Sequence, residues 1–487
     1  MAKEKLKVAF VSAEITGFAS TGGLGDVARA LPEELKRGGV EAIRIMPLYR
    51  TVRQAVPDIK PQEIVFSIPM GQDTWRAEAW ASRGRGVKTW FINKEECFDR
   101  EGLYSLEDRP FDDNFERFLL FQKAVVALLD ALKFRADIVH CNDWHCALVP
   151  LLLRYGIDGS GRKKREKVLF SIHNLAYQGL FPSHKFDLTN LPGHTFTHHH
   201  MEFFGQLNCM KTGIADSDWV STVSEAYARE IQTPAFGCGL DPLLQHRRKK
   251  LTGILNGVDY REWNPARDPH IPASFRSNAL AGKETCKKAL LTEFGLKYDA
   301  DTPLIVMVSR MTDQKGFDVM ATAMPRLMSR KLHLIILGSG ERKYRDQALA
   351  WASKWPGRIA VKIGFDIALA HRIEAGGDFF LMPSRFEPCG LNQLYSLKYG
   401  TIPIVHDTGG LSDSIVDLAK PNGNGFKMNA YTAKALDMAV QRALGLYGQS
   451  DALKRVRQAA MRQDFSWKNS AKAYLGLYRK LLHKRSR

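Results

Sequence analysis

Residues 5–46 decide the fold, because they form one complete strand–loop–helix–strand unit. The segment KLKVAFVSA (5–13) is short and rich in Val and Phe, as buried parallel strands are. A glycine-containing loop, 17–25, leads into 26–36, where apolar residues recur at helical spacing. Gly38 and Gly39 end that helix, and 40–46 resumes as a strand. This unit predicts an α/β fold with a doubly wound parallel sheet.

The same alternation recurs on both sides of a polar, proline-containing stretch at 256–272, which we interpret as a linker. We therefore predict two Rossmann-like domains facing across a cleft, formed by 1–255 with 464–487 and by 256–463. The apolar stripe of 467–487 predicts a final helix that crosses back onto the first domain. Before the linker the predicted strands are 137–140, 168–172 and 219–223, and the predicted helix is 225–231. After it the predicted strands are 304–309, 332–338, 358–363, 379–383 and, as the last, 402–405, with a helix at 316–330.

The chain is basic, with 70 Lys plus Arg against 52 Asp plus Glu and a formal net charge of +18. The excess gathers at 161–167, 246–250 and 483–487. This balance favours an anionic small molecule, and because no nucleic-acid-binding motif accompanies the runs we expect no nucleic-acid partner. No apolar stretch approaches the roughly 18–20 residues that span a bilayer, so we expect no membrane partner and a cytoplasmic location.

Cysteine and histidine usage gives no sign of a metal or disulfide framework. The seven cysteines are an odd number and no two form a Cys-x-x-Cys pair, which argues against a disulfide scaffold and a zinc ribbon. The run His198–His200 invites a metal interpretation, but adjacent residues rarely converge on one ion. We interpret this run as a polar loop.

Two similar glycine loops stand between a strand and a helix, STGGLGD (20–26) and TGGLSD (408–413). Glycines there let a ligand approach the backbone, and a helix N-terminus favours an anion. Neither loop is the dinucleotide fingerprint G-x-G-x-x-G, which weakens a nicotinamide-dehydrogenase hypothesis. One such loop alone is as consistent with a tight turn, but two, one per domain, predict that both helix N-termini approach a bound diphosphate.

Charged residues follow two of the predicted strands in the second half. In VSRMTDQKG (308–316), Arg310 and Lys315 follow one strand, and in PSRFEPCGLNQ (383–393), Glu387 follows another at the start of a predicted helix. Two cations at the carboxyl edge of a parallel sheet suit a diphosphate leaving group, and a carboxylate there can hold sugar hydroxyls. Solvated surface cations and a helix N-terminal carboxylate are the structural alternatives. Cys389 is interpreted as a small buried filler rather than a nucleophile.

Long motifs then extend the pattern over nearly the whole chain, in order. On these motifs the chain resembles the bacterial glycogen synthase and plant starch synthase family, retaining glucosyltransferases of two-Rossmann (GT-B) architecture. The motifs are TGGLGDV (21–27), DDNFERFLLF (112–121), HCNDWHCALVP (140–150), SIHNLAYQGLFP (171–182), EFFGQLNCMKTGI (202–214), STVSEAYAREIQTPAFGCGLD (221–241), ILNGVD (254–259), VSRMTDQKG (308–316) and GDFFLMPSRFEPCGLNQLYSLKYGTIPIV (377–405).

The resemblance implies transfer of glucose from ADP-glucose, or UDP-glucose in some members, to the non-reducing 4-hydroxyl of an α-1,4-glucan such as glycogen. Configuration is retained and no metal or redox cofactor is required. By position, Arg310 and Lys315 would grip the diphosphate, and Glu387 would be the essential carboxylate. His173 would face the transferred glucose and Asp143 the acceptor side. The further donor-binding positions are Ser20, Gly22, Gly23, Asn256, Gly390, Leu391, Thr408, Gly409 and Gly410.

Structural alternatives stand beside two of these roles. His173 also fits a loop histidine, and Asp143 also fits an N-cap for a helix at 144–153. The chain departs from the family at Ser20, where a lysine that contacts the donor is usual, and this leaves open weaker donor binding, another donor or a substitute cation. Eight residues past Glu387 stands Tyr395, not the second carboxylate of the wider E-x7-E pattern. An active synthase and a catalytically silent glucan-binding homologue therefore remain as hypotheses, and retention of Glu387, Arg310, Lys315 and His173 favours the first.

Overall fold

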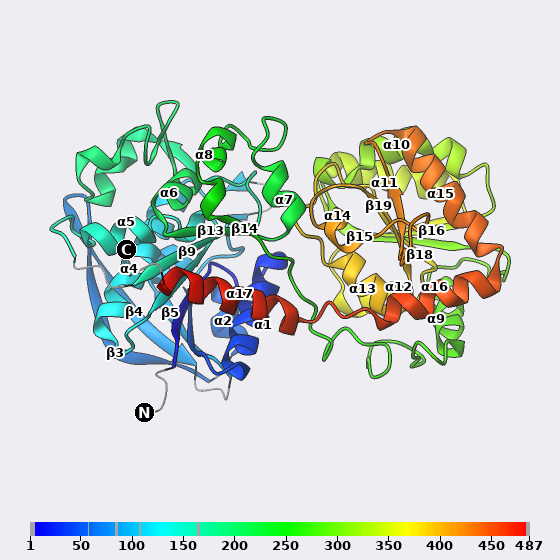
Figure 1. Ribbon diagram of the computed structural model, residues 1–487, viewed down its shortest axis with the longest axis horizontal. Helices are drawn as coiled ribbons and strands as arrows, with labels where there is room; N and C mark the ends of the chain where they lie inside the picture. Colours follow the sequence, from blue (N-terminus) through cyan, green and yellow to red (C-terminus); the bar gives the residue numbers. More distant parts are fainter. Residues whose placement is uncertain (1–4, 57, 83–85, 107–108, 163–165, 484–487) are drawn as a thin grey trace. The chain divides into compact units, whose positions relative to one another are not determined.

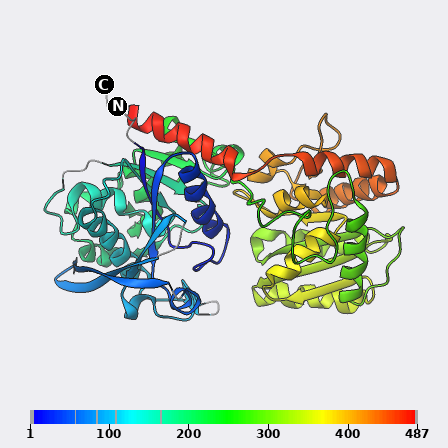
Figure 2. The ribbon, with the colours of Figure 1, turned by 90° about the horizontal axis from the view of Figure 1, so that it is seen from below.

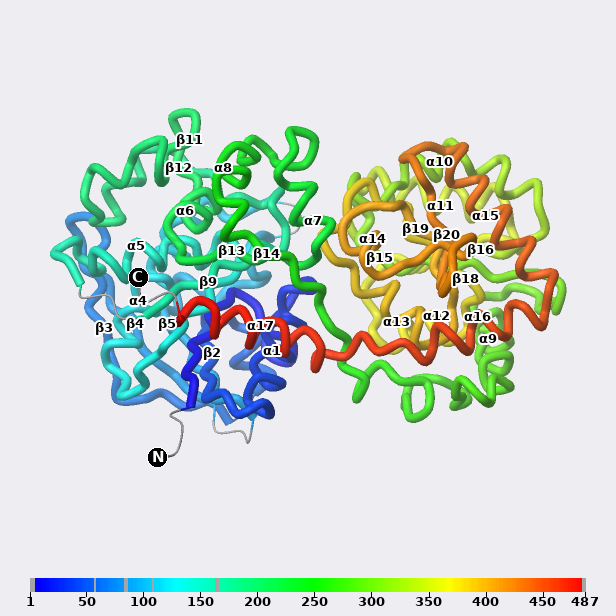
Figure 3. The backbone as a smooth tube through the Cα atoms, in the orientation of Figure 1, coloured from blue at the N-terminus to red at the C-terminus, as the bar shows by residue number. Residues whose placement is uncertain are grey.

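The computed structural model describes residues 5–56, 58–82, 86–106, 109–162 and 166–483. Contacts divide the chain into two compact units: Met1–Ile254 with Trp467–Arg487 form unit 1, and Leu255–Ser466 form unit 2. The backbone therefore passes between the units twice, at 254–255 and at 466–467 (Figure 3). Parts of two basic runs, residues 163–165 and 484–487, lie outside the described ranges.

Unit 1 is built on a nine-stranded sheet in the described part of the chain (Figure 1). In spatial order its strands are β14 (Leu251–Gly253), β13 (Trp219–Thr222), β9 (Lys167–Ile172), β8 (Ile138–Asn142), β1 (Lys7–Val11), β2 (Glu41–Pro47), β5 (Lys88–Asn93), β4 (Asp73–Ser82) and β3 (Ile59–Met70). From β14 to β5 all neighbouring strands are parallel. The chain runs outward from β1 in both directions, so the strand order reverses between β1 and β8, which is where doubly wound sheets bind ligands.

The helices of unit 1 include the C-terminal one. They are α1 (Gly23–Arg37), α2 (Arg50–Ala55), α3 (Glu95–Phe98), α4 (Asn114–Ala131), α5 (Val149–Tyr155), α6 (Cys209–Asp216), α7 (Glu225–Glu230), α8 (Asp241–His246) and α17 (Trp467–His483). Short strands also pair as β10 (Leu180–Pro182), β12 (Gln206–Asn208) and β11 (Glu202–Phe203), and as β6 (Ser105–Leu106) and β7 (Arg109–Pro110). Helix α17 packs along α1 (Figure 1) and buries its apolar stripe, which confirms the predicted crossing helix.

Unit 2 is built on a fully parallel sheet of six strands among its residues, all of which are described. Its strand order is β17 (Ile359–Ile363), β16 (His333–Gly340), β15 (Leu304–Met311), β18 (Phe379–Met382), β19 (Ile402–His406) and β20 (Phe426–Met428). The strand order reverses between β15 and β18. Its helices are α9 (Ala281–Glu293), α10 (Phe317–Leu327), α11 (Arg342–Lys354), α12 (Ile367–Gly376), α13 (Asn392–Tyr399), α14 (Gly409–Ser414), α15 (Ala433–Tyr447) and α16 (Ser450–Arg462).

The central strands read as continuous apolar runs because helices cover both faces of each parallel sheet. Strand β16 buries its first six residues in succession, and β8 is buried throughout. The core of unit 2 gathers side chains from β15, β16 and β18 with α10 and α15. These observations confirm the predicted α/β fold class. Among the described residues, no helix combines the length and apolar character needed to cross a bilayer.

Three details differ from the sequence-based predictions. The antiparallel strands β4 and β3 extend the edge of the unit 1 sheet as a long hairpin (Figure 2), and β20 follows the strand predicted to be last. Glu387 lies in the loop after β18, five residues before α13 begins, rather than at a helix start. The stretch 256–272 is irregular as expected, but it is anchored to unit 2, because the Trp263 ring stacks on His371 at 3.8 Å and on Tyr395 at 4.0 Å.

Candidate active site

At the carboxyl edge of the unit 2 sheet, Lys315 and Glu387 form an ion pair. Lys315 ends a short 3-10 turn after β15, and its Nζ donates to Glu387 Oε2 at 2.6 Å. Ser384 Oγ donates to the same oxygen at 3.0 Å. The side chains of Lys315 and Glu387 are only 14% and 8% exposed. This largely buried ion pair therefore joins the loops that follow β15 and β18, the two strands between which the strand order reverses.

Two glycines let these loops approach one another closely. Gly316 has φ +79°, and a Cβ there would collide with the carbonyl group of Pro383. Gly410 lies in the second glycine loop, and a Cβ there would collide with the backbone of Cys389. The Gly410 amide donates to the Glu387 carbonyl oxygen at 2.9 Å. Thr408, Gly409 and Gly410 are therefore held beside the Glu387 loop.

Two exposed side chains lie on the same edge. Arg310 is exposed near the end of β15, five residues before Lys315. Phe365, in the loop between β17 and α12, is 87% exposed. Strand β17 lies two strands from β15, a distance of roughly 10 Å. An aromatic ring this exposed beside a cationic edge suits stacking on a flat ligand, and the sequence analysis missed it. The sequence signal that could have identified Phe365 is an aromatic residue directly after Gly364 at the end of a predicted strand.

Asn256 and Cys389 are buried neighbours in unit 2. They are 5% and 6% exposed, and the Asn256 backbone forms a hydrogen bond with the Cys389 thiol. Burial raises the pKa of Cys389 to about 12, so the thiol is protonated at neutral pH, as expected of a filler. The Asn256 Oδ1 atom is buried without a hydrogen-bond partner among the described residues. Gly390, with φ +72°, and Leu391 continue this loop into α13.

In unit 1, Asp143 and His173 meet at the carboxyl ends of β8 and β9. The His173 amide donates to Asp143 Oδ1 at 2.7 Å, and the His173 ring donates from Nε2 to Asn142 Oδ1 at 2.9 Å. Asp143 stands at the N-cap position of the 3-10 turn Trp144–Cys146, but its side chain makes no capping hydrogen bond, and its backbone has φ 56° and ψ −178°, a region that only glycine adopts freely. The N-cap position was predicted, but the carboxylate is used elsewhere, and the strained backbone lies where doubly wound sheets bind ligands.

Burial changes the protonation of both side chains. Burial raises the pKa of Asp143 to about 7, although two backbone amides that donate to its carboxylate act to lower that pKa. Burial also lowers the pKa of His173 to about 3. His173 is therefore neutral at pH 7 with its proton on Nε2, while Asp143 titrates near neutrality.

The glycine loop of unit 1 is held by hydrogen bonds to Glu14, a residue that the sequence did not single out. The Glu14 carboxylate, 4% exposed, accepts from the Thr21 amide at 2.6 Å and from the Gly22 amide at 3.3 Å. It also accepts from the Tyr104 hydroxyl at 2.7 Å. The amide of Gly22, a predicted donor-binding position, is thus already occupied, as is the amide of Thr21. Ser20 and Gly23 are exposed on either side of them.

The residues offered as metal or disulfide candidates have ordinary surroundings. The rings of His198 and His199 lie 3.8 Å apart, and His200 Nδ1 pairs with Asp216 at 3.0 Å. In the described part of the chain, no group of three or more His, Cys, Asp or Glu side chains is placed to hold a metal ion. The seven cysteines all lie within the described ranges and form no disulfide there.

Two Rossmann-like units, each with polar side chains at the carboxyl edge of its sheet, form the architecture of two-Rossmann glycosyltransferases. Comparison with known proteins agrees. The family model of the starch synthase catalytic domain matches residues 7–246, and that of glycosyl transferases group 1 matches residues 292–462.

The chain belongs to the glycogen and starch synthase family. It is 44% identical over 478 residues to a glycogen synthase of Anaeromyxobacter dehalogenans strain 2CP-C, covering 98% of this chain and 100% of that relative. It is 40% identical over 476 residues to glycogen synthase 2 of Geobacter sulfurreducens, covering 97% and 98%. Among solved structures, the catalytic domain of starch synthase IV from Arabidopsis thaliana, bound to ADP and acarbose, matches with TM-score 0.90 and 30% identity over 99% and 100% of the two chains.

These relatives confirm the predicted enzyme class, a glucosyltransferase of glycogen or starch synthesis that uses a nucleotide-sugar donor and a glucan acceptor. They leave the identity of the donor nucleotide and the roles of single residues to be derived from the geometry above.

Proposed function

We propose that the chain transfers glucose from ADP-glucose to the non-reducing 4-hydroxyl of an α-1,4-glucan with retention of configuration. The observation that carries this proposal is the Lys315–Glu387 pair at the carboxyl edge of unit 2, 2.6 Å apart. It supplies a cation for a diphosphate and a carboxylate for sugar hydroxyls at one place. The solved relative from Arabidopsis thaliana, bound to ADP, supports an adenine nucleotide as the donor group.

The donor would bind along the edge of the unit 2 sheet. Arg310 and Lys315 would hold the diphosphate, with the exposed Phe365 ring as a platform for the adenine. The loops at 408–410 and 390–391 would supply backbone contacts, and Asn256 a buried acceptor. Because Ser20 provides no charge, Arg310 and Lys315 would carry most of the charge compensation on the diphosphate.

The unit 1 edge would serve the sugars. His173, neutral and oriented by Asn142, and the loop bearing Ser20, Gly22 and Gly23 would contact the transferred glucose. Asp143 would face the acceptor. Carboxylate, imidazole and amide groups are those that recognise hydroxyl-rich ligands.

Chemistry would proceed by front-face substitution. The bond from glucose C1 to the diphosphate oxygen breaks, and C1 bonds to the acceptor O4 on the same face. The acceptor hydroxyl proton passes to the leaving diphosphate oxygen, so no side chain has to act as the base. Lys315 and Arg310 stabilise the charge that develops on the leaving group, and the protein contributes mainly positioning and electrostatics.

The test is incorporation of labelled glucose into glycogen from ADP-glucose and from UDP-glucose in parallel, with Glu387→Ala as the control. We expect incorporation from ADP-glucose that falls by at least about a thousandfold in the control. Incorporation from UDP-glucose alone would overturn the donor assignment and point to Ser20 as part of a donor switch. No incorporation from either donor, with glycogen binding intact, would favour a catalytically silent homologue.

A further inference from the structure

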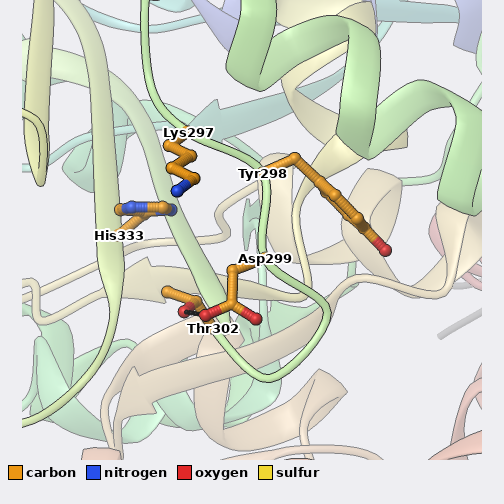
Figure 4. A pocket seen from close by; sticks show the side chains of 5 residues that line it. All are labelled: Lys297, Tyr298, Asp299, Thr302 and His333. Carbon is orange, nitrogen blue, oxygen red and sulfur yellow. Dashed lines mark hydrogen bonds between the residues drawn. The ribbon is translucent and has the colours of Figure 1, made fainter.

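A pocket of about 350 Å³ opens at the amino edge of the unit 2 sheet, opposite the edge that carries Lys315 and Glu387. It is lined by Lys297, Tyr298, Asp299, Thr302 and His333 (Figure 4). His333 is the first residue of β16, and Thr302 lies two residues before β15. Strand β16 has eight residues, so roughly 26 Å of sheet separates this pocket from the carboxyl edge.

His333 is the feature that points to a ligand. Its side chain is nine-tenths buried, with 7% of the residue exposed, yet its Nδ1 has no hydrogen-bond partner among the described residues. Buried polar groups in proteins are nearly always satisfied, so a histidine in the wall of a pocket with one ring nitrogen unsatisfied is an exception that calls for an explanation. In Figure 4 the amino group of Lys297 is directed toward this imidazole ring. The two side chains thus present an ammonium group and an imidazole to the same space.

The carboxylate that lines the pocket is already paired, which leaves the exposed Lys297 as the cation of the lining. The one carboxylate in its lining, Asp299, pairs with Lys331 at 2.6 Å and accepts from Thr302 Oγ1 at 2.9 Å. Arg358, in the segment before β17, also lies near His333, whereas Lys287 on α9 is already paired with Asp378 at 2.7 Å. Lys297 is exposed and adds a further positive charge at the opening. An anionic group suits this exposed ammonium better than a neutral one.

We propose that this pocket binds the phosphoryl group of a small molecule, as a free phosphate or a sugar phosphate. Lys297 holds the phosphoryl oxygens as a point charge, and the His333 imidazole donates a hydrogen bond to one of them. The volume exceeds what one phosphate ion fills, which leaves room for a sugar beside it. The site is separate from the proposed donor site, because it lies at the other end of the same strands.

Histidine NMR tests the proposal at this site alone, whatever binds at the carboxyl edge. Protein labelled with ¹³C-histidine is titrated with inorganic phosphate, and in parallel with a hexose monophosphate, at constant ionic strength. The His333 resonance is identified by its loss in His333→Gln. We expect it to shift saturably, and Lys297→Gln to weaken the apparent affinity by about tenfold or more. The matched control is Lys454→Gln, an exposed lysine on α16, which should leave the titration unchanged.

The outcomes separate cleanly. Tighter binding of the hexose monophosphate than of phosphate assigns the site to a sugar phosphate, whereas equal binding assigns it to free phosphate. A His333 resonance that does not move, or that moves linearly without saturation, overturns the proposal. Equal weakening by Lys297→Gln and Lys454→Gln also overturns it, because the effect would then be general charge screening. Activity enters none of these readouts, so failure here leaves the proposed function untouched.

Discussion

Single residues at the carboxyl edge of the unit 2 sheet can be tested one at a time for their part in the proposed donor site, because one substitution removes each contact. The Lys315–Glu387 pair has low exposure, so loss of either partner leaves the other charge uncompensated in a poorly solvated place. Phe365 differs, since its ring is 87% exposed and packs little against the protein. Its role is therefore testable without damage to the fold.

We predict that Phe365→Ala raises the KM for ADP-glucose by about tenfold or more while kcat changes little. Base–aromatic stacking contributes roughly 1–3 kcal/mol, and the ring is remote from the bond that breaks. Steady-state kinetics with varied ADP-glucose measures this. The matched control is Ile367→Ala, a neighbour that is 50% exposed and has no ring to stack. Unchanged KM in Phe365→Ala, or the same rise in both variants, would remove Phe365 from the donor site.

Asp143 gives a prediction for pH. Its folded pKa, raised to about 7 from 3.8, means that the folded protein keeps a proton that the unfolded chain has released. Stability contributed by this group is thus full below about pH 4 and is lost as pH rises to about 7, by roughly 4 kcal/mol at most. Asp143→Asn keeps an acceptor for the His173 amide and removes the titration. Urea unfolding of unit 1 between pH 4.5 and 7.5 should show a flatter pH dependence in the variant, and parallel curves would show that Asp143 does not titrate in this range.

Residues could be predicted where the neighbouring sequence alone places them in the fold. Lys315 and Glu387 each follow a buried strand, and parallel strands bring their carboxyl ends to one edge, so their proximity was predictable. Glu14 was not predictable, because its partner Tyr104 is 90 residues away and a carboxylate after a strand has no distinctive pattern. Tyr395 was noted only as a missing carboxylate. Its use, stacking on Trp263, depends on a tertiary contact.

Helices and strands, like single residues, could be predicted where local sequence determines them and were missed where tertiary contacts do. Strands β8, β9, β15 and β16 were predicted because buried parallel strands are continuous apolar runs. The hairpin of β3 and β4 was missed, since its strands mix buried and exposed positions and contain Pro61 and Pro69. Helix α17 was predicted from its stripe, but its polar anchor was not. That anchor is Tyr478, whose hydroxyl bonds with His140 Nδ1 at 2.8 Å.

We predict that Tyr478→Phe lowers the free energy of unfolding by about 1–2 kcal/mol. The His140 Nε2 atom is bonded to Ser171 Oγ at 2.6 Å, so losing the hydroxyl leaves Nδ1 buried and unsatisfied. Denaturant unfolding followed by circular dichroism measures the change. The matched control is Tyr49→Phe, because the Tyr49 hydroxyl is buried without a hydrogen-bond partner among the described residues, and its removal should cost nothing. A Tyr478→Phe variant as stable as the control would show that this bond does not fasten α17.

Truncation tests the whole of α17. Deleting residues 467–487 uncovers the face of α1 on which the helix packs and removes the Tyr474 and Tyr478 rings from the His140 ring of the sheet. We expect the truncated chain to lose soluble expression or activity, which expression trials and the incorporation assay measure. A truncated chain that folds and retains full activity would contradict the structural role given to this helix.

At the scale of the whole molecule, each unit carries its own part of the proposed chemistry. Unit 2 offers cations, a paired carboxylate and an exposed aromatic ring, which suit a nucleoside diphosphate. Unit 1 offers Asp143, a neutral His173 and a glycine loop, which suit sugar hydroxyls. Neither the groups of unit 1 nor those of unit 2 suffice alone. We therefore infer that transfer of glucose to a glucan requires both units.

The most direct test of that account is the stereochemistry of the bond made. A maltooligosaccharide is incubated with ADP-[1-¹³C]glucose, and the product is examined by NMR and by digestion with an α-1,4-specific hydrolase. We expect a new α-1,4-linked glucose at the non-reducing end, with transfer greatly reduced in Lys315→Ala. A β-linked product, a different linkage, or equal transfer by Lys315→Ala would contradict it.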